Sequence, residues 1–449
     1  MERFEQKVAR ESGDVLQVIA AESLIPVTEN VTWDKAPELL CSYNWQGSPD
    51  GTNTIFVPGA PAKWQPPTLP HTLDRDSGFQ YTDYNYARQP RDPFSPMFHA
   101  MSVMNPNYQF NDIDVVADRN SLRVLLGFTQ GKANGPFRLD LYLNLNTLII
   151  VRNESNWWKF SNGEGYGCNF ERFFTRPTKG MEDAESHYRA IKYAMGPLNV
   201  VCRFEADAYD DGLGSDELTQ SEVSAVSGGP TERPRFDYRP RIRVLQKGHI
   251  VPMSQMVELK TKKYDPEQFR PVMCQDQLWF GRTSLLFTAP YGHNTGTIER
   301  VKREDATQRV KNWEESNQES LRKLVSLLTE LRDVLKRERR PNRAVVLVRD
   351  EKAGPLSVRS MEGMNHAVGR EFFVRHWTIA QRGGYRGGRG AFNPPRGHPY
   401  APRERDAAQE RGSGRGGRGA FNPPRGHPYA PRGRGAAPER GFGRGRGYA

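Results

Sequence analysis

The chain contains few cysteines, and they follow no recognisable pattern. Its four cysteines, Cys41, Cys168, Cys202 and Cys274, include no C-x-x-C pair and have no zinc-like spacing with histidine. This argues against a disulfide framework and a cysteine-based metal site, and it indicates a reducing compartment. The nine histidines form no H-E-x-x-H or H-x-E motif, so neither a zinc protease nor a zinc deaminase is indicated.

Long apolar runs are also missing. No segment approaches the roughly 18–20 apolar residues that a membrane-spanning helix needs. The first residues, MERFEQKVARESGD, are charged from position 2 onward, so we expect neither a secretory signal nor a membrane partner. A G-x-x-x-x-G-K-[ST] sequence is absent, which argues against a P-loop. We therefore expect an intracellular protein.

Lysine is absent from the last part of the chain, where arginine is abundant. Residues 382–449 hold 15 Arg, no Lys and four acidic residues. This segment accounts for the entire net charge of +11, so the rest of the chain is electrically balanced. An 18-residue sequence, RGGRGAFNPPRGHPYAPR, occurs at 386–403 and again, unchanged, at 415–432. With almost no aliphatic residues the segment cannot bury enough surface to fold, and we expect 381–449 to be a disordered tail.

The composition of this tail is typical of RNA-binding segments. Arginine binds phosphates and stacks on bases, the interspersed aromatic residues stack too, and glycine keeps the chain pliable. We expect single-stranded RNA as the partner of the tail, and a purely solubilising or self-associating role is the alternative. The arginines at the start of the two repeats are the candidate contacts: Arg386, Arg389, Arg415 and Arg418.

The body of the chain, residues 1–380, has the patterns of a mixed α and β domain. Residues 137–152 alternate and then run apolar, which predicts a hairpin turning at Asn144–Asn146. Further strands are expected at 198–209 and within 241–263, with a turn at 246–248. A surface loop is expected at about 210–240. Helical spacing of apolar residues extends from Asp305 to about Arg340 and ends before Pro341.

Two of the expected strands carry charged residues in alternation with apolar ones. In RFEADAYD, residues 203–210, Glu205 and Asp207 share one face, and in MVELKTKK, residues 256–263, Glu258 and Lys260 do the same. Such a pattern describes any half-exposed strand. Carboxylates that converge from neighbouring strands, however, are the oxygen ligands that Mg²⁺ or Mn²⁺ requires. A lysine beside them can stabilise charge in phosphodiester cleavage.

The order of these motifs adds a more specific indication. The segments GYGCNFE (165–171), FEADA (204–208), VELKT (257–261) and QLWFGRTSLLF (277–287) follow one another along the chain. Together with SYNW (42–45) and ADRNSLRVLL (117–126), this series resembles the DXO/RAI family of decapping nucleases. The resemblance extends over about residues 38–345. It implies an elaborated PD-(D/E)XK-like core, with mixed β-sheets flanked by helices.

The resemblance also implies roles for individual residues. It makes metal-associated carboxylates of Glu171, Glu205, Asp207 and Glu258, with Mg²⁺ or Mn²⁺ as the cofactor. It makes Lys260 the catalytic lysine, acting with Glu258 and Asp207. Gln277 would be a polar group near the scissile phosphate, and Arg119 would contact the RNA backbone.

The function implied is metal-dependent processing of RNA 5′ ends in RNA quality control, by decapping, pyrophosphate release or 5′–3′ exonuclease cleavage. The alternative is a catalytically inactive RNA-binding scaffold that assists a processive 5′–3′ exoribonuclease. The basic run KRERRPNR at 336–343 is compatible with a nuclear address and equally with a solvated helix end. We expect the nucleus as the location, with the cytoplasm as a second one.

Overall fold

The computed structural model describes residues 4–377, except 48–51, 133–134, 155, 164, 213–240, 264–270, 293–294, 341–342 and 364–365. The chain divides into two units, Met1–Gln381 and Arg382–Ala449. The second unit lies outside the described residues, as does most of the loop expected at 210–240. The predicted division into a nuclease domain and a disordered tail therefore stays a prediction.

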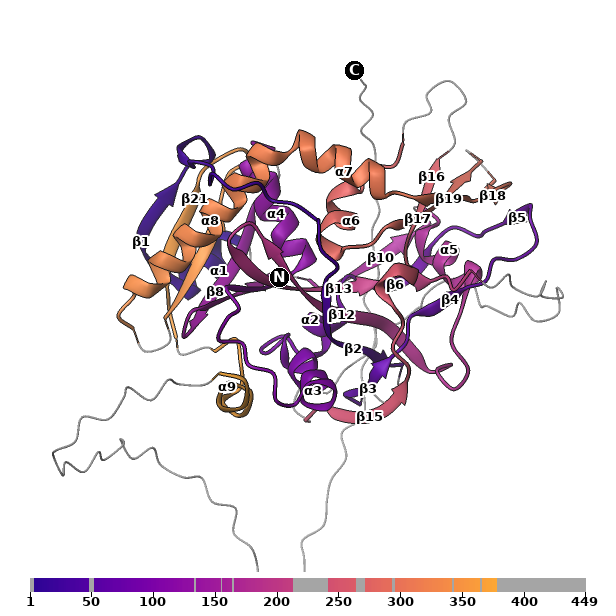
Figure 1. Cartoon of the computed structure of the whole chain (residues 1–449), viewed down its shortest axis with the longest axis horizontal. Helices are drawn as coiled ribbons and strands as arrows, with labels where there is room; N and C mark the ends of the chain where they lie inside the picture. Colours follow the sequence, from indigo (N-terminus) through magenta and orange to yellow (C-terminus); the bar gives the residue numbers. More distant parts are fainter. Residues whose placement is uncertain are drawn as a thin grey trace, which may run out of the picture. The chain divides into compact units, whose positions relative to one another are not determined.

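The centre of the first unit is a large mixed sheet of eleven strands (Figure 1). It contains parallel pairs, such as β13 with β7, and antiparallel ones, such as β13 with β12. In spatial order the strands are β1 (Ser12–Ile19), β21 (Leu356–Met361), β20 (Ala344–Arg349), β8 (Phe137–Asn144), β9 (Thr147–Arg152), β7 (Val115–Asp118), β13 (Leu198–Ala206), β12 (Ala184–Met195), β2 (Glu38–Gln46), β3 (Thr54–Gly59) and β15 (Arg243–Gly248).

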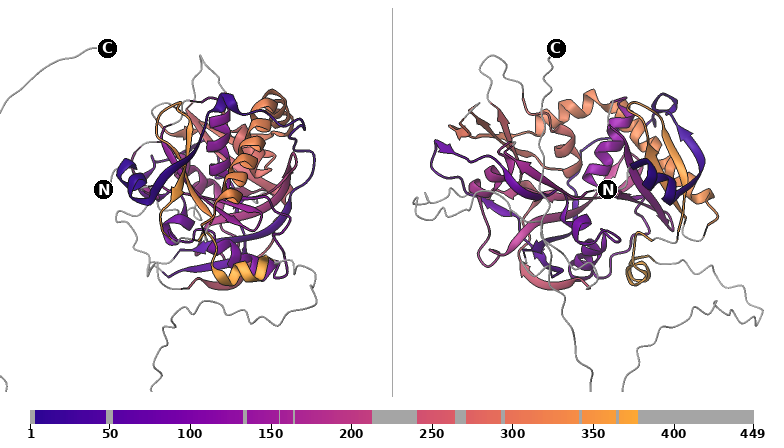
Figure 2. Two further views of the ribbon diagram at one scale, coloured as in Figure 1. Left: turned by 90° about the vertical axis from the view of Figure 1, so that its left-hand side faces the viewer. Right: turned by 180° about the vertical axis from the view of Figure 1, so that it is seen from behind.

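A second sheet of eight strands and a two-stranded ribbon complete the β structure. Seen from behind, β1 and the second sheet lie at opposite ends of the first unit (Figure 2). The second sheet runs in the order β11 (Thr175–Arg176), β4 (Ala62–Trp64), β14 (Ala208–Tyr209), β16 (Met256–Lys263), β17 (Leu285–Tyr291), β18 (Thr297–Ile298) and β5 (His71–Thr72), with β19 (Lys302–Asp305) also paired to β17. The ribbon pairs β6 (Ser77–Tyr81) with β10 (Trp158–Asn162).

Helices cover both faces of the large sheet. Figure 1 shows α4 (Arg119–Thr129) and α8 (Gln318–Arg337) above it, and α3 (Ser95–Met104) and α9 (Arg370–His376) below. α8 buries a leucine every three or four residues against the sheet, which is the spacing that places side chains on one helical face. The other helices are α1 (Phe4–Glu11), α2 (Tyr84–Arg88), α5 (Gly167–Phe174), α6 (Gln275–Gly281) and α7 (Thr307–Ser316).

The fold class predicted from the sequence is confirmed, and so is the hairpin at 137–152. β8 and β9 pair antiparallel, with Asn144 opposite Thr147, and Leu145 turns the chain with a φ of 52°. In the part of the chain that the structure describes, no helix is long and apolar enough to cross a membrane.

Two details of the sequence prediction are wrong. Residues 246–248 do not form a turn but end strand β15, beside β3. Gly248, with a φ of +91°, is needed there because a Cβ would lie 2.4 Å from the Gly59 backbone. The helix expected from Asp305 to Arg340 is two helices, α7 and α8, separated at Asn317. Apolar residues at helical spacing lie on both sides of the break, Val310 and Trp313 before it and Leu321 after it, so periodicity alone does not reveal it.

Candidate active site

The candidate site lies where one stretch of chain passes from the large sheet into the second sheet. β13 ends at Ala206 in the large sheet, and β14 begins at Ala208 in the second one, so Asp207 stands at the junction. β16 pairs antiparallel with β14, with Val257 opposite Ala208. This register brings Glu258 next to Asp207, because the Leu259 N–H donates to Asp207 Oδ2 at 2.8 Å.

Two cations hold the buried carboxylate of Glu258. Lys260 Nζ lies 2.5 Å from Glu258 Oε1 and 3.7 Å from Asp207 Oδ2. Arg119, the first residue of α4, donates from Nη1 to Glu258 Oε2 at 2.9 Å. Burial alone would raise the pKa of Glu258, but Arg119 and Lys260 lower it to about 2. The same carboxylates raise the pKa of Lys260 against the effect of burial, so the amine is an ammonium at neutral pH.

The large sheet positions Arg119. Strand β7 runs parallel to β13 and ends at Asp118, opposite Arg203. The Arg203 guanidinium is fully buried and binds the Asp118 carboxylate through both Nε and Nη2, at 2.7 and 3.2 Å. Because α4 starts at the next residue, this ion pair fixes the point from which Arg119 reaches Glu258.

Glu171 enters the site from α5. This helix is anchored at its first turn by Asp76, which accepts the backbone N–H groups of Cys168 and Asn169 at 3.1 and 2.9 Å. Phe170 and Phe174 pack on the opposite side, against Trp64. The Glu171 side chain is exposed to a cavity, yet the surrounding protein and nearby Asp207 raise its pKa well above the usual range.

Three of the four carboxylates, those of Glu171, Glu205 and Asp207, have raised pKa values because their surroundings disfavour the ionised form. Burial and Glu258 raise the pKa of Asp207 to about 6. Burial raises the pKa of Glu205 to about 7, with Asp83 and Asp207 adding to the shift. Crowded carboxylates disfavour each other's charge, and a divalent cation between them would remove that penalty.

The donor set therefore fits a hard divalent cation in its chemistry, because it consists of carboxylate oxygens. As the side chains stand, no group of three or more His, Cys, Asp or Glu among the described residues is arranged to hold a metal ion. The reason is visible in the contacts: Glu258 gives both oxygens to Arg119 and Lys260, and Asp207 accepts the Leu259 N–H. A metal ion would share these oxygens with their present partners or displace one of them, since each carboxylate oxygen has two lone pairs.

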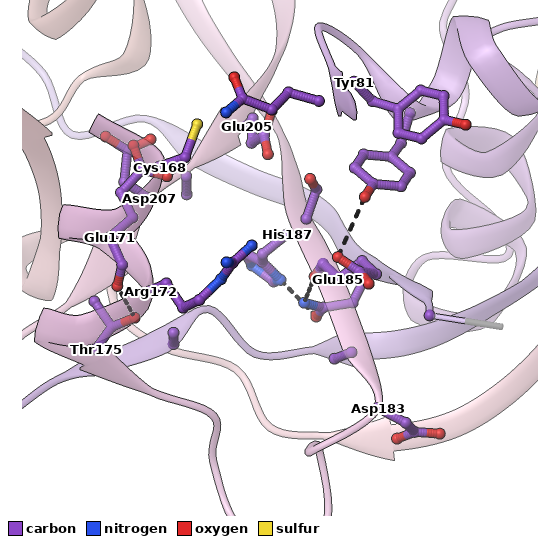
Figure 3. A pocket seen from close by; sticks show the side chains of 18 of the residues that line it. Tyr81, Cys168, Glu171, Arg172, Thr175, Asp183, Glu185, His187, Glu205 and Asp207 are labelled. Atoms are coloured by element: carbon purple, nitrogen blue, oxygen red, sulfur yellow. Dashed lines mark hydrogen bonds between the residues drawn. The ribbon is translucent and has the colours of Figure 1, made fainter. Parts of the chain in front are cut away.

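Three of the carboxylates, Glu171, Glu205 and Asp207, line a cavity of about 870 Å³ (Figure 3), and Glu258 is buried behind them. We call this cavity the first cavity. In Figure 3, Glu171 and Asp207 lie on one side of it, and Arg172 lies between these two residues and His187. The rest of its lining includes the aromatic and basic side chains of Phe79, Tyr81, Tyr84, Arg88 and Arg172 and the acidic ones of Glu182, Asp183 and Glu185. A cavity of this size accommodates a ligand as large as a nucleotide.

The structure thus gathers six of the residues selected from the sequence: Glu171, Glu205, Asp207, Glu258, Lys260 and Arg119. Gln277 lies in the first turn of α6, where its backbone N–H donates to Asp276 Oδ1. Arg386, Arg389, Arg415 and Arg418 lie outside the described residues. The roles assigned to all of these residues stay predictions.

Sequence reasoning missed the supports of the site. Asp118 and Arg203 were not selected, although Asp118 directly precedes Arg119 and Arg203 lies two residues before Glu205. The aromatic wall of the first cavity was missed as well, because Phe79, Tyr81 and Tyr84 come from a segment with no catalytic motif. For Asp118, the available signal was an acidic residue directly before Arg119.

Comparisons with known proteins bear mainly on the fold. A family model described as "Domain of unknown function (DUF8563)" matches residues 13–377. No curated protein sequence matches the chain.

Solved structures of Rai1 proteins are similar. The Scheffersomyces stipitis Rai1 complex with (3′-NADP)+ and calcium ion has a TM-score of 0.50 and 12% identity, over 80% of this chain and 98% of that one. Rai1 from S. pombe has a TM-score of 0.49 and 12% identity, over 76% and 99%. Candida albicans Rai1 in complex with pU5-Mn2+ has a TM-score of 0.47 and 12% identity, over 80% and 98%. The S. stipitis match establishes a distant Rai1-like fold for this chain.

Proposed function

The chain belongs to the family described as Domain of unknown function (DUF8563), and we propose that it is a metal-dependent hydrolase that processes the 5′ ends of RNA. The observation that carries this proposal is the convergence of Asp207, Glu258 and Lys260 at the junction of the two sheets. Glu171 and Glu205 stand nearby, beside a cavity of about 870 Å³. The calcium ion and (3′-NADP)+ in the S. stipitis Rai1 complex are in keeping with this proposal.

Each residue has a part in the proposed reaction. Glu171, Glu205, Asp207 and Glu258 would hold a divalent cation, Mg²⁺ or Mn²⁺, which when bound polarises the phosphate and activates water. The Lys260 ammonium donates hydrogen bonds to the attacking water or to a phosphate oxygen as negative charge develops there. Arg119 is placed to transfer its guanidinium from Glu258 to a phosphate, since its planar fork suits both anions.

The first cavity would receive the 5′-terminal part of the RNA. Tyr81 and Tyr84 offer aromatic rings to a base, with ring centroids 5.0 Å apart, and the exposed Arg172 offers positive charge to phosphates. Tyr84 is held in place by its hydroxyl, which donates to Glu185 at 3.3 Å. Decapping, pyrophosphate release and exonuclease cleavage would be the same hydrolysis at phosphorus. They would differ only in which phosphate bond of the 5′ end lies at the metal.

Other parts of the proposal rest on the sequence. We include in it a PD-(D/E)XK-like catalytic core, the arginine-rich tail as an RNA-holding segment, a 5′–3′ exoribonuclease as partner and the nucleus as location. The tail would raise the concentration of RNA near the first cavity without selecting a sequence.

One observation favours a second candidate function. Arg119 and Lys260 already neutralise Glu258, as a metal ion would. If these two cations stay on Glu258 in place of a metal ion when RNA binds, the site does not activate water. The protein would then be an RNA-binding scaffold or a cofactor of an exoribonuclease.

The experiment that tests the proposal uses the full chain with Mn²⁺ or Mg²⁺. The substrates are RNAs that carry a 5′ monophosphate, triphosphate, unmethylated cap, methylated cap or NAD. The variants are Glu258→Gln and Lys260→Ala, and Glu319→Gln, an exposed carboxylate on α8 paired with Lys323, is the matched control. We expect the wild type and the control to release a 5′ product that EDTA abolishes, and the two site variants to release it at least roughly 10² times more slowly. RNA binding without cleavage of any substrate would overturn the nuclease in favour of the scaffold.

A further inference from the structure

The β6–β10 ribbon carries an aromatic face that packing does not account for. Its register places Phe160 opposite Phe79 and Trp158 opposite Tyr81. Residues that face each other across antiparallel strands point to the same side, and so do residues two apart along a strand. All four rings therefore lie on one face of the ribbon. Phe79 contacts both rings of β10, with centroids 5.1 Å from Trp158 and 5.0 Å from Phe160.

This face is open to solvent. The Phe160 side chain is 50% exposed, and the other three rings are half-buried. A two-stranded ribbon is only marginally stable alone, and exposed apolar patches mark sites of interaction. We therefore expect this patch to bind a ligand that stacks on aromatic rings.

The position of the ribbon indicates the occupant. Phe79 and Tyr81 line the first cavity, beside Glu171 and Asp207. Across the ribbon, Trp158 lines a second cavity of about 710 Å³. The aromatic face therefore continues the candidate active site and connects it with the second cavity.

The second cavity contains cations as well as aromatic rings. Trp157 lies there on Tyr86, with ring centroids 4.2 Å apart. Two of its arginines are held by carboxylates, Arg138 by Asp140 and Arg152 by Asp83. The exposed Arg91 and the half-buried Lys7, which donates to Asn153, add positive charge that can lie near phosphates.

We propose that the aromatic face of the β6–β10 ribbon is a stacking platform for single-stranded RNA. It binds the nucleotides that follow the terminal one and leads them from the first cavity to the second. This inference rests on the proposed function, because it takes RNA to be the ligand of the first cavity. Stacking requires unpaired bases and works with any of the four, so the platform selects single strands without selecting a sequence. A protein partner would have no need of a platform continuous with the active site.

The test compares the binding of two RNAs by the full chain. A dinucleotide fills the first cavity alone, whereas a ten-nucleotide strand also reaches the ribbon. Binding is measured by fluorescence anisotropy with 5′-phosphorylated, 3′-labelled RNA in EDTA, so that nothing is cut. Raised salt weakens the contribution of the arginine-rich tail and leaves stacking largely intact.

The variants are Phe160→Ala, Phe160→Tyr and, as a control, Val374→Ala, which truncates a 70% exposed apolar side chain on α9. We expect Phe160→Ala to weaken binding of the ten-nucleotide strand about tenfold and to affect the dinucleotide far less. Phe160→Tyr keeps the ring and should restore binding, and the control should match the wild type. Equal effects on both RNAs, or no effect, would overturn the platform.

Photocrosslinking provides a second readout that does not depend on affinity. The ten-nucleotide strand carries 4-thiouridine at an interior position, and the crosslinked peptides are identified by mass spectrometry. Crosslinks to β6 or β10 support the platform, and crosslinks confined to other segments contradict it. Both readouts work without cleavage. If no RNA is cut and Phe160→Ala still weakens binding, the proposed nuclease activity is wrong and the platform is supported. If RNA is cut and Phe160→Ala does not weaken binding, the nuclease activity is supported and the platform is wrong.

Discussion

Arg203 Nε lies 2.7 Å from Asp118 Oδ1, and both side chains are buried in the large sheet. The Tyr86 hydroxyl donates to the other oxygen of Asp118 at 2.7 Å. Arg119, the first residue of α4, directly follows Asp118, and Glu205 lies two residues beyond Arg203 on β13. The ion pair therefore joins β7 and β13, the strands that lead to Arg119 and Glu205. Its loss should lower the stability of the fold more directly than it lowers the rate of catalysis.

The first prediction concerns that ion pair. Asp118→Asn leaves the Arg203 guanidinium buried without a countercharge, which should lower the free energy of unfolding by about 3–5 kcal/mol. Urea denaturation followed by tryptophan fluorescence measures the change. Asp333→Asn, at an exposed pair with Lys336, is the control and should change stability by less than about 1 kcal/mol. Equal effects of the two substitutions would contradict the structural role of Asp118.

The second prediction concerns Lys260. Lys260→Met removes the ammonium that faces Glu258 and Asp207. On the substrate that the wild type cleaves, kcat should fall by roughly 10²–10³, the usual effect of losing one donor to a developing oxyanion, and KM should change little. Steady-state cleavage of a 5′-labelled RNA gives both constants. A rise in KM with an unchanged kcat would instead make Lys260 a ground-state binding residue.

The third prediction is a pH dependence of stability at Asp92. Burial raises the pKa of this carboxyl to about 7, against 3.8 ordinarily. Between about pH 4 and 7 the unfolded chain loses the proton and the folded chain keeps it, so this group makes the fold less stable as pH rises through that window. Asp92→Asn should abolish the effect and stabilise the protein above pH 7 by up to about 4 kcal/mol. Thermal melts of both proteins from pH 4 to 8 should diverge with increasing pH; parallel curves would refute the assignment.

The fourth prediction concerns the arginine-rich tail. Deletion of residues 382–449 removes 15 arginines, so RNA affinity should fall, and the dependence of log K on log salt should become shallower. Cleavage of short RNAs should persist, since the residues of the candidate site all precede the deletion. A salt titration of RNA binding for the full and the shortened chain measures the slopes. Identical slopes would show that the tail does not contact the phosphates.

Local patterns in the sequence predicted part of this structure. Alternation identified β13 and β16, and hence the strands that carry Glu205, Glu258 and Lys260. The contact between Arg119 and Glu258 joins residues 139 positions apart, and no local pattern encodes it. Residues 246–248 resemble a turn because they end in glycine, whereas the glycine is required by the close approach of Gly59. Both the Arg119–Glu258 contact and the conformation at Gly248 depend on tertiary packing, which the local sequence does not show.

The passage of one strand from sheet to sheet has a consequence for how the protein opens. Because only Asp207 separates β13 from β14, one continuous segment runs from the large sheet into the second sheet. Separating them breaks the bond from the Leu259 amide to Asp207. Protection of that amide from hydrogen exchange therefore reports on the seam between the sheets, and an opening that releases it dismantles the carboxylate cluster in the same event.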